Sequence, residues 1–208
     1  MNDENRETEV ILIRHGETSW NREHRFQGHQ DIKLNNKGVN QAKKAGQFLA
    51  SYDIDVIYSS ELERAYQTAV IINKKHRVKV IKKSGLKEIN FGDWEGLTYE
   101  EIEKNNSEKI KKWNNNPWSN SPPAGESLES FYQKVVNTID GIIEKNKGDT
   151  ILIVSHGGVI KTYLTYILDM PPENYWQFDT ASTGISNIKF YNNKAIIDRI
   201  NSRPHLNL

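Results

Sequence analysis

The stretch Val10-Ile11-Leu12-Ile13-Arg14-His15-Gly16-Glu17 joins a short apolar run to an abrupt set of polar residues. The apolar run is rich in β-branched side chains and predicts a buried strand. In open α/β sheets ligands bind at the carboxyl ends of the strands, and Gly16 allows a sharp turn or a close approach of the backbone there. Arg14 and His15 are therefore candidates for a binding site; the alternative is a solvated turn with an incidental histidine.

A second apolar run has the same design. Residues 149–155 form a continuous apolar stretch that ends in His156-Gly157-Gly158. Parallel strands of one sheet end on the same edge, so His15 and His156 are expected to face each other across one crevice.

A third polar group is expected at this edge. The predicted strand 55–59 is followed by Ser60, which can cap a helix over residues 62–75. This arrangement places Arg64 in the first turn of that helix. Arg64 can therefore join the two histidines.

The remaining pattern alternates strands with helices and predicts a doubly wound α/β fold. We expect three α/β/α layers around a mostly parallel sheet, with an antiparallel edge strand from a C-terminal hairpin joined at Asn192-Asn193. Residues 1–208 are read as a single domain, in which a helical insertion of about residues 86–126 covers the site. The other predicted elements are helices over 18–23, 36–49, 98–105, 108–113, 127–145 and 159–168, and strands over 78–82, 184–191 and 194–200.

Composition narrows the possible partners. The chain has 208 residues, of which 36% are hydrophobic and 26% charged, as in ordinary globular proteins. Lys and Arg number 28 against 27 Asp and Glu, so no bulk charge points to nucleic acid or to a membrane surface. The absence of cysteine excludes thiolate chemistry and fits a reducing compartment. The polar start and the lack of a long apolar segment favour a cytoplasmic protein.

The expected cluster of charges suits an anion. Guanidinium groups bind phosphate oxygens in pairs, and amides at a helix start add partial positive charge. Arg14, Arg64 and the two histidines are thus complementary to a doubly charged tetrahedral group. No carboxylate lies at ligand spacing from either histidine and the arginines repel cations, so neither a metal nor a cofactor is expected.

Four motifs together carry a family resemblance. In order along residues 10–158, they resemble the histidine phosphatase superfamily, the branch that includes cofactor-dependent phosphoglycerate mutase, and are most similar to small bacterial phosphatases such as the α-ribazole phosphatases. The motifs are Arg14-His15-Gly16-Glu17-Thr18 with Trp20-Asn21, Arg64-Ala65-Tyr66-Gln67-Thr68, Leu86-Lys87-Glu88 with Gly92-Asp93-Trp94-Glu95-Gly96, and Val154-Ser155-His156-Gly157.

The resemblance implies a role for each site residue. His15 would attack phosphorus as a neutral imidazole, since neighbouring arginines disfavour its protonation. Glu88 would be the general acid and then the general base, although a surface carboxylate in a lysine-rich loop is the alternative. His156 would act best as a protonated donor. The residues expected to bind substrate are Arg14, Asn21, Gln27, Gly28, Arg64, Glu88, His156 and Gly157.

Three functions remain open at this point. A phosphomonoester hydrolase acting on a small phosphorylated metabolite is favoured, because the segment around Asn114-Asn115-Asn116-Pro117-Trp118 lacks the paired arginines of the glycolytic mutases. A cofactor-dependent phosphoglycerate mutase and a catalytically silent phospholigand-binding module are the alternatives. Residues 97–125 and 180–184 are expected to wall the pocket, and the final hairpin could support a homodimer. The other histidines, His24, His29, His76 and His205, are read as surface residues.

Overall fold

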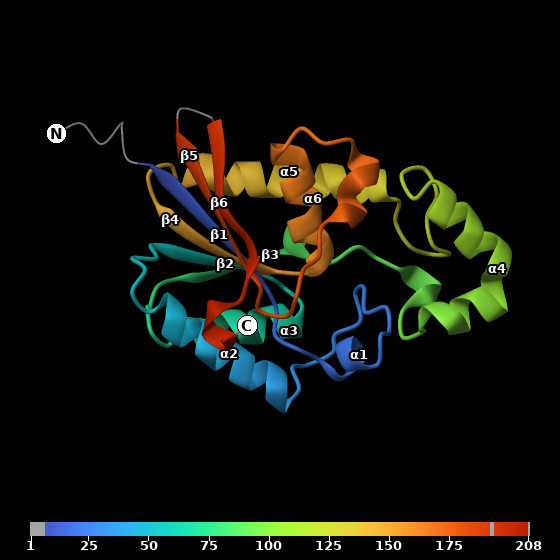
Figure 1. Cartoon of the computed structure of the whole chain (residues 1–208), viewed down its shortest axis with the longest axis horizontal. Helices are drawn as coiled ribbons and strands as arrows, with labels where there is room; N and C mark the ends of the chain where they lie inside the picture. Colours follow the sequence, from blue (N-terminus) through green and yellow to red (C-terminus); the bar gives the residue numbers. More distant parts are fainter. Residues whose placement is uncertain (1–6, 192–193, 208) are drawn as a thin grey trace.

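The computed structural model describes residues 7–191 and 194–207, and its centre is a single six-stranded sheet (Figure 1). The strand order is β3-β2-β4-β1-β5-β6. The predicted hairpin turn at Asn192-Asn193 lies outside the described residues. The strands are β1 (Thr8–Arg14), β2 (Val56–Ser60), β3 (Val80–Lys83), β4 (Thr150–Ser155), β5 (Ile185–Tyr191) and β6 (Lys194–Ser202).

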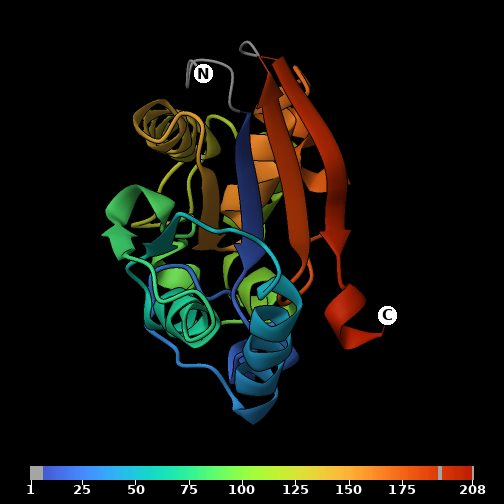
Figure 2. The ribbon, with the colours of Figure 1, turned by 90° about the vertical axis from the view of Figure 1, so that its left-hand side faces the viewer.

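Strand pairing confirms the mostly parallel sheet. β1 pairs in parallel with β4, and β2 pairs in parallel with both β4 and β3. β5 runs antiparallel to β1 and to β6, which lies at the edge, so the hairpin supplies the antiparallel part (Figure 2). The register places Arg14 opposite Ser155, so β1 and β4 end level with each other. The residues that follow these two strands meet at one edge of the sheet.

Helices cover both faces of the sheet, as three layers require (Figures 1 and 2). α5 and α6 pack on one face, where Leu12 and Ile153 join their apolar residues, and α2 and α3 pack on the other with Ile11 and Leu152. None of the helices in the described ranges is long and apolar enough to cross a membrane. The helices are α1 (Ser19–Arg22), α2 (Asn36–Leu49), α3 (Glu63–Asn73), α4 (Tyr99–Asn115), α5 (Leu128–Lys145) and α6 (Gly157–Ile167), with short 3-10 turns η2 (Ser84–Leu86), η3 (Gly92–Trp94), η4 (Pro172–Gln177) and η5 (Pro204–Leu206).

The predicted helical insertion contains η3 and α4, which lie beyond one end of the sheet (Figure 1). The two helices expected at 98–105 and 108–113 form one element, with non-helical backbone at Asn106 where the gap was placed. Thr98 and Glu101 begin α4 with a reciprocal capping box. Trp94 and Trp113 are buried in the same core as α5 and α6, so the insertion packs on the body of the protein.

One capping prediction is wrong. Ser60 ends β2 and does not cap α3, whose first residue is Glu63. The backbone N–H of Glu63 donates instead to the carboxylate of Asp31, at 2.6 Å. The capping oxygen therefore comes from a distant loop, and the hydroxyl of Ser60 has another partner, described below.

Candidate active site

His15 lies directly after β1 and is 2% exposed. Its backbone N–H donates to the carbonyl of Ser155 on β4, at 2.9 Å, which holds the residue against the neighbouring strand. Its ring Nδ1 lies 2.7 Å from the carbonyl oxygen of Gly16. Because a carbonyl only accepts, Nδ1 carries the proton and Nε2 keeps its lone pair. The ring is thus in the tautomer that can act as a nucleophile through Nε2.

His156 follows β4 and faces His15, as the sequence predicted. The two ring centroids are 5.2 Å apart and the rings meet edge to face. Its Nε2 lies 2.8 Å from the hydroxyl of Ser60, which also accepts the N–H of Leu62. A hydroxyl that already accepts is free to donate, so Ser60 favours the tautomer of His156 that carries its proton on Nδ1. That Nδ1 is buried and has no partner within the described chain, and it can donate to a ligand.

Two buried arginines flank the histidines. Arg14 ends β1 and donates through one terminal nitrogen to the carbonyl of Thr180. Arg64, in the first turn of α3, donates to the carbonyls of Gln30 (2.7 Å) and Gly28 (2.8 Å). The Nε of each guanidinium is buried and has no partner within the described chain. Buried donors without partners are costly, so these groups are arranged to receive an anion.

Burial and positive charge govern the protonation of both histidines. Burial, Arg64 and Arg14 hold the pKa of His15 well below its ordinary value of 6.5. Burial, Arg64 and His15 lower the pKa of His156 in the same direction. The neutral form of His15 agrees with its expected role. The expectation that His156 acts as a protonated donor concerns the phosphate-bound site and stays a prediction; in the free protein, burial and the surrounding positive charge favour its neutral form.

These lowered pKa values predict that the protein loses stability in mild acid. Between pH 6.5 and the lower pKa of the folded state, these two histidines are protonated in the unfolded chain and neutral in the folded protein. Lowering the pH in this range therefore favours unfolding. Each histidine contributes a slope of at most about 1.4 kcal/mol per pH unit. Urea unfolding from pH 7 down to pH 5 is expected to show a falling free energy of unfolding, with a smaller slope for His156→Gln. An unchanged slope in that variant would contradict the lowered pKa.

Glu88 brings a carboxylate to the same edge. It follows η2, and its side-chain oxygens accept the N–H groups of Ile89 (3.0 Å) and Gly158 (3.2 Å). Gly158 lies in the first turn of α6, where the helix start favours negative charge. Glu88 also interacts electrostatically with both Arg14 and Arg64. The sequence alternative of a surface carboxylate therefore does not describe this residue.

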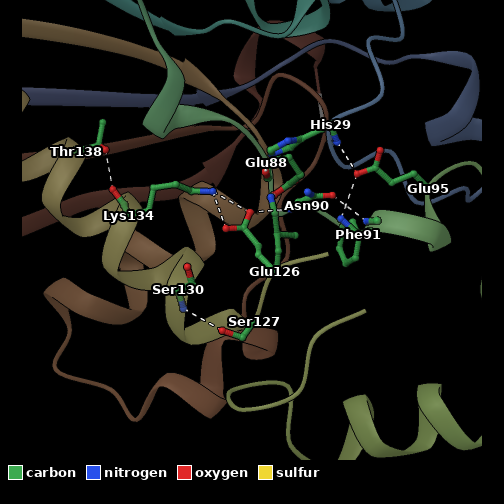
Figure 3. Close-up of polar contacts among 12 residues, drawn as sticks. His29, Glu88, Asn90, Phe91, Glu95, Glu126, Ser127, Ser130, Lys134 and Thr138 are labelled. Carbon is green, nitrogen blue, oxygen red and sulfur yellow. Dashed lines mark hydrogen bonds and ion pairs between the residues drawn. The ribbon is translucent and has the colours of Figure 1, made fainter. Parts of the chain in front are cut away.

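A set of polar contacts positions the loop that carries Glu88 (Figure 3). The ring of His29 donates through Nε2 to the carbonyl of Glu88, at 2.9 Å. Glu95 accepts the backbone N–H groups of His29 and Phe91, and so ties the His29 loop to the residues that follow Glu88. The prediction that His29 is a surface residue is wrong, since it is half-buried beside the site. The one signal in the sequence for a position near the site was that His29 directly follows Gly28, a predicted binding residue.

A second anchor lies on the other side of that loop (Figure 3). Glu126 accepts the N–H of Asn90 at 2.8 Å and forms an ion pair with Lys134 of α5 at the same distance. The Gly125-Glu126-Ser127 segment thus fastens the Glu88 loop to α5. Lys134 was not singled out in the sequence.

Gly158 is packed so closely against Glu88 that a side chain at this position would displace the carboxylate. A Cβ at this position would overlap the Oε1 of Glu88 and approach Phe131. The carboxylate is the flexible partner and would move first. Gly158→Ala is therefore expected to lower kcat for an alkyl phosphate by about 10-fold or more, as displaced catalytic groups do, with little change in stability.

Steady-state kinetics with urea unfolding measures both quantities for Gly158→Ala. Gly141→Ala is the matched control, because no atom beyond its chain neighbours and its own helix backbone lies within 4 Å of the Cβ it would add. Full activity in Gly158→Ala would show that the position of Glu88 is unimportant.

The remaining predicted binding residues lie near Arg14 and Arg64, in different roles. The side chain of Asn21 accepts the N–H of Thr18 at 3.0 Å and lines a cavity with Arg14. Gln27 is buried, and its side-chain oxygen accepts a hydrogen bond from the hydroxyl of Thr18. The carbonyl of Gly28 accepts a hydrogen bond from the guanidinium of Arg64. A Cβ on Gly157 would approach Thr180 and Arg14, so the absence of a side chain at Gly157 allows the start of α6 to pack against Arg14.

The other histidines differ in their exposure to solvent. His24 is exposed, as predicted. His76 and His205 are half-buried, so the surface prediction is wrong for both. His205 lies 2.9 Å from the hydroxyl of Thr183, and burial lowers its pKa to about 4.

A cavity of about 560 Å³ opens beside Arg14 and Asn21. Its wall includes Trp20, Phe26 and residues 179–182. His15, Arg64, Glu88 and His156 do not line this cavity, so it adjoins the site through Arg14. The pocket walls expected from 97–125 and 180–184 therefore stay predictions.

A fold with two facing histidines, two buried arginines and one carboxylate at a single sheet edge defines a phosphoryl-binding enzyme class. The family model described as histidine phosphatase superfamily (branch 1) matches residues 10–203. The chain belongs to this superfamily, and the resemblance seen in the four motifs is confirmed.

Named relatives span most of the chain. It is 40% identical over 157 residues to phosphoglycerate mutase-like protein 4 of Arabidopsis thaliana, covering 74% of this chain and 68% of the relative. It is 32% identical over 197 residues to phosphoserine phosphatase 1 of Hydrogenobacter thermophilus, covering 95% and 93%.

Solved structures of phosphatases have a similar fold. The α-ribazole phosphatase of Shigella flexneri aligns with a TM-score of 0.87 at 32% identity, over 94% of this chain and 96% of that one. A mutant of phosphoserine phosphatase from Entamoeba histolytica, in complex with phosphoserine, aligns with a TM-score of 0.85 at 37% identity, over 96% and 99%. These similarities confirm the predicted fold, and they support a phosphatase better than a mutase.

Proposed function

We propose that this protein hydrolyses phosphate monoesters of small metabolites through a phosphohistidine at His15. The observation that carries the proposal is a buried, neutral imidazole with its Nε2 lone pair free, beside two arginines that hold unpartnered donors. A neutral nucleophile within a positive site is suited to attack a phosphate dianion.

In the first step, Nε2 of His15 forms a bond to phosphorus and the ester P–O bond breaks. Glu88, protonated, gives its proton to the departing alkoxide oxygen. In the second step, water forms a new P–O bond, the N–P bond breaks, and Glu88 takes the proton from the water. Inorganic phosphate leaves and His15 returns to its starting form.

The other residues stabilise charge on the equatorial oxygens of the transferring group. Arg14 and Arg64 donate from their guanidinium groups, and His156 donates from Nδ1, whose proton Ser60 helps to retain. Asn21 adds an amide donor, and the N-terminus of α6 at Gly157 adds backbone N–H groups. A bound dianion also offsets the positive charge that lowers the pKa of His156, so the protonated donor form belongs to the complex.

Hydrolysis is favoured over mutase chemistry because a mutase must hold a phosphorylated acid and exclude water. The helical segment of residues 86–126, which we propose as the lid, offers Asn114, Asn115 and Asn116 where paired arginines would serve that purpose. Relatives and solved structures of phosphatases support the same choice.

A substrate panel tests the proposal. Phosphate release from p-nitrophenyl phosphate, phosphoserine, 3-phosphoglycerate and α-ribazole phosphate is expected without added metal, with no stimulation by 2,3-bisphosphoglycerate. Interconversion of phosphoglycerates that depends on this cofactor would establish a mutase. Binding without release on every ester would establish a silent binding module.

Three further features complete the proposal. We infer metal-independent catalysis, because Arg14 and Arg64 repel a cation from the histidines. A reducing, cytoplasmic location suits a chain without cysteine. β6 presents an edge with exposed Ile196 and Ile200, which suits pairing in a homodimer.

A further inference from the structure

Lys161 lies on α6, on the face that meets the active site. Gly157 and Gly158 come four and three residues before it, so the three residues share one helix face. At Gly157 that face approaches Thr180 and Arg14, and at Gly158 it approaches the carboxylate of Glu88. The side chain of Lys161 therefore starts one helical turn beyond the groups that surround the phosphate.

The ammonium group of Lys161 is half-buried among aromatic rings. Its Nζ lies 5.7 Å from the ring centroid of Tyr175 and 5.5 Å from that of Trp176. Tyr175 is only 4% exposed, and its ring forms a fixed wall for the cation. Rings at this distance attract a cation and limit the positions it can take.

No carboxylate in the described part of the chain forms an ion pair with this lysine. The charged groups around it are Glu88, Arg14 and Asp179, which act on it through space. Glu88 is already bonded to the N–H groups of Ile89 and Gly158. A half-buried cation without an ion-pair partner is costly, and a ligand anion would remove the cost.

We propose that Lys161 binds the carboxylate of the substrate, and that the preferred substrates are short phosphorylated carboxylic acids. This inference rests on the proposed function, because the phosphate of the same molecule must lie at His15. A single carboxylate fits better than a second phosphate, since one ammonium balances one negative charge while the carboxylate of Asp179 would repel a dianion.

Matched substrate pairs test the inference. Phosphoserine and phosphoethanolamine differ only by the carboxylate, and 3-phosphoglycerate and glycerol 3-phosphate differ by a carboxylate replaced with a hydroxymethyl group. Lys161→Met removes the charge and keeps the apolar stem, while Lys161→Arg restores a cation. Lys145→Met, at the exposed end of α5, is the matched control.

The wild type is expected to have a higher kcat/KM for each carboxylate-bearing member. Lys161→Met is expected to lower kcat/KM for phosphoserine by about 10- to 100-fold, the range for a hydrogen bond to a charged group, chiefly through KM. Phosphoethanolamine and p-nitrophenyl phosphate should change by less than about 3-fold, Lys161→Arg should recover most of the loss, and Lys145→Met should match the wild type.

Two results would overturn the inference. One is an equal loss of kcat/KM in Lys161→Met on both members of a pair, which would mean that Lys161 contacts the phosphate itself. The other is a wild type whose kcat/KM is the same with and without the carboxylate. If the wild type hydrolyses no ester, the proposed function fails separately. Calorimetric binding to His15→Ala then decides about Lys161, since phosphoserine must still bind more tightly than phosphoethanolamine and lose that advantage in His15→Ala/Lys161→Met.

Discussion

His15→Ala is expected to lower kcat for p-nitrophenyl phosphate by about 10⁴-fold or more, the scale on which removal of a nucleophile acts. The physical reason is that water cannot take the place of an imidazole held against Gly16 with its Nε2 lone pair free. Wild type that is quenched in denaturant during turnover should carry a phosphoryl group that is labile to acid and stable to alkali. That phosphoenzyme should be absent from His15→Ala.

The matched control is His76→Ala. His76 lies beyond the carboxyl end of α3, the end opposite to Arg64, and is a half-buried histidine. Its replacement is expected to leave kcat unchanged. Hydrolysis that survives in His15→Ala would show that water attacks phosphorus directly, and the phosphohistidine proposal would be wrong.

Glu88→Gln is expected to produce the second large effect, and the effect should depend on the leaving group. An amide cannot donate the proton that an alkoxide needs, so kcat for phosphoserine should fall by about 10²- to 10⁴-fold, the usual contribution of general acid–base catalysis. Nitrophenolate is a weak base and leaves without a proton. With p-nitrophenyl phosphate the variant should therefore show a burst of nitrophenolate, followed by slow turnover as the phosphoenzyme accumulates.

Rapid-mixing absorbance measures the burst, and acid-labile phosphate measures the intermediate. Glu129→Gln, an exposed carboxylate in the first turn of α5, is the control and should show neither effect. Equal loss of activity on both substrates, without a burst, would assign Glu88 to structure and remove it from proton transfer.

Much of the fold was accessible from the local pattern. Continuous apolar runs predict buried parallel strands because both faces of such a sheet are covered, and β1 and β4 fit this rule. The long helix starting after Ser127 was also predicted, since its cap and its apolar face are both local signals. Capping of α3 by Asp31 was missed because that contact joins residues 32 positions apart.

In the site, too, some features follow from the local sequence pattern and others depend on contacts between distant residues. The edge that joins His15, His156 and Arg64 follows from strand direction, which the order of elements already implies. The orientation of Glu88 does not, because it depends on a gap left by Gly158 and on His29 and Glu126 from two separate loops. Lys161 was also missed, since a single lysine on a helix carries no signal until Tyr175 and Trp176 enclose it.

The sequence by itself determined that the stretch from Val10 to Glu17 contains a buried strand that ends at an arginine and is followed by a histidine and a glycine. It also determined that a second buried strand is followed by a histidine and glycines. It also determined the family, because four motifs occur in order. Only the tertiary structure decided that His15 is a neutral imidazole with a free Nε2, and that Ser60 is the partner of His156. Protonation and tautomer depend on burial and on partners distant in the chain, and these exist only once the sheet and its loops have assembled.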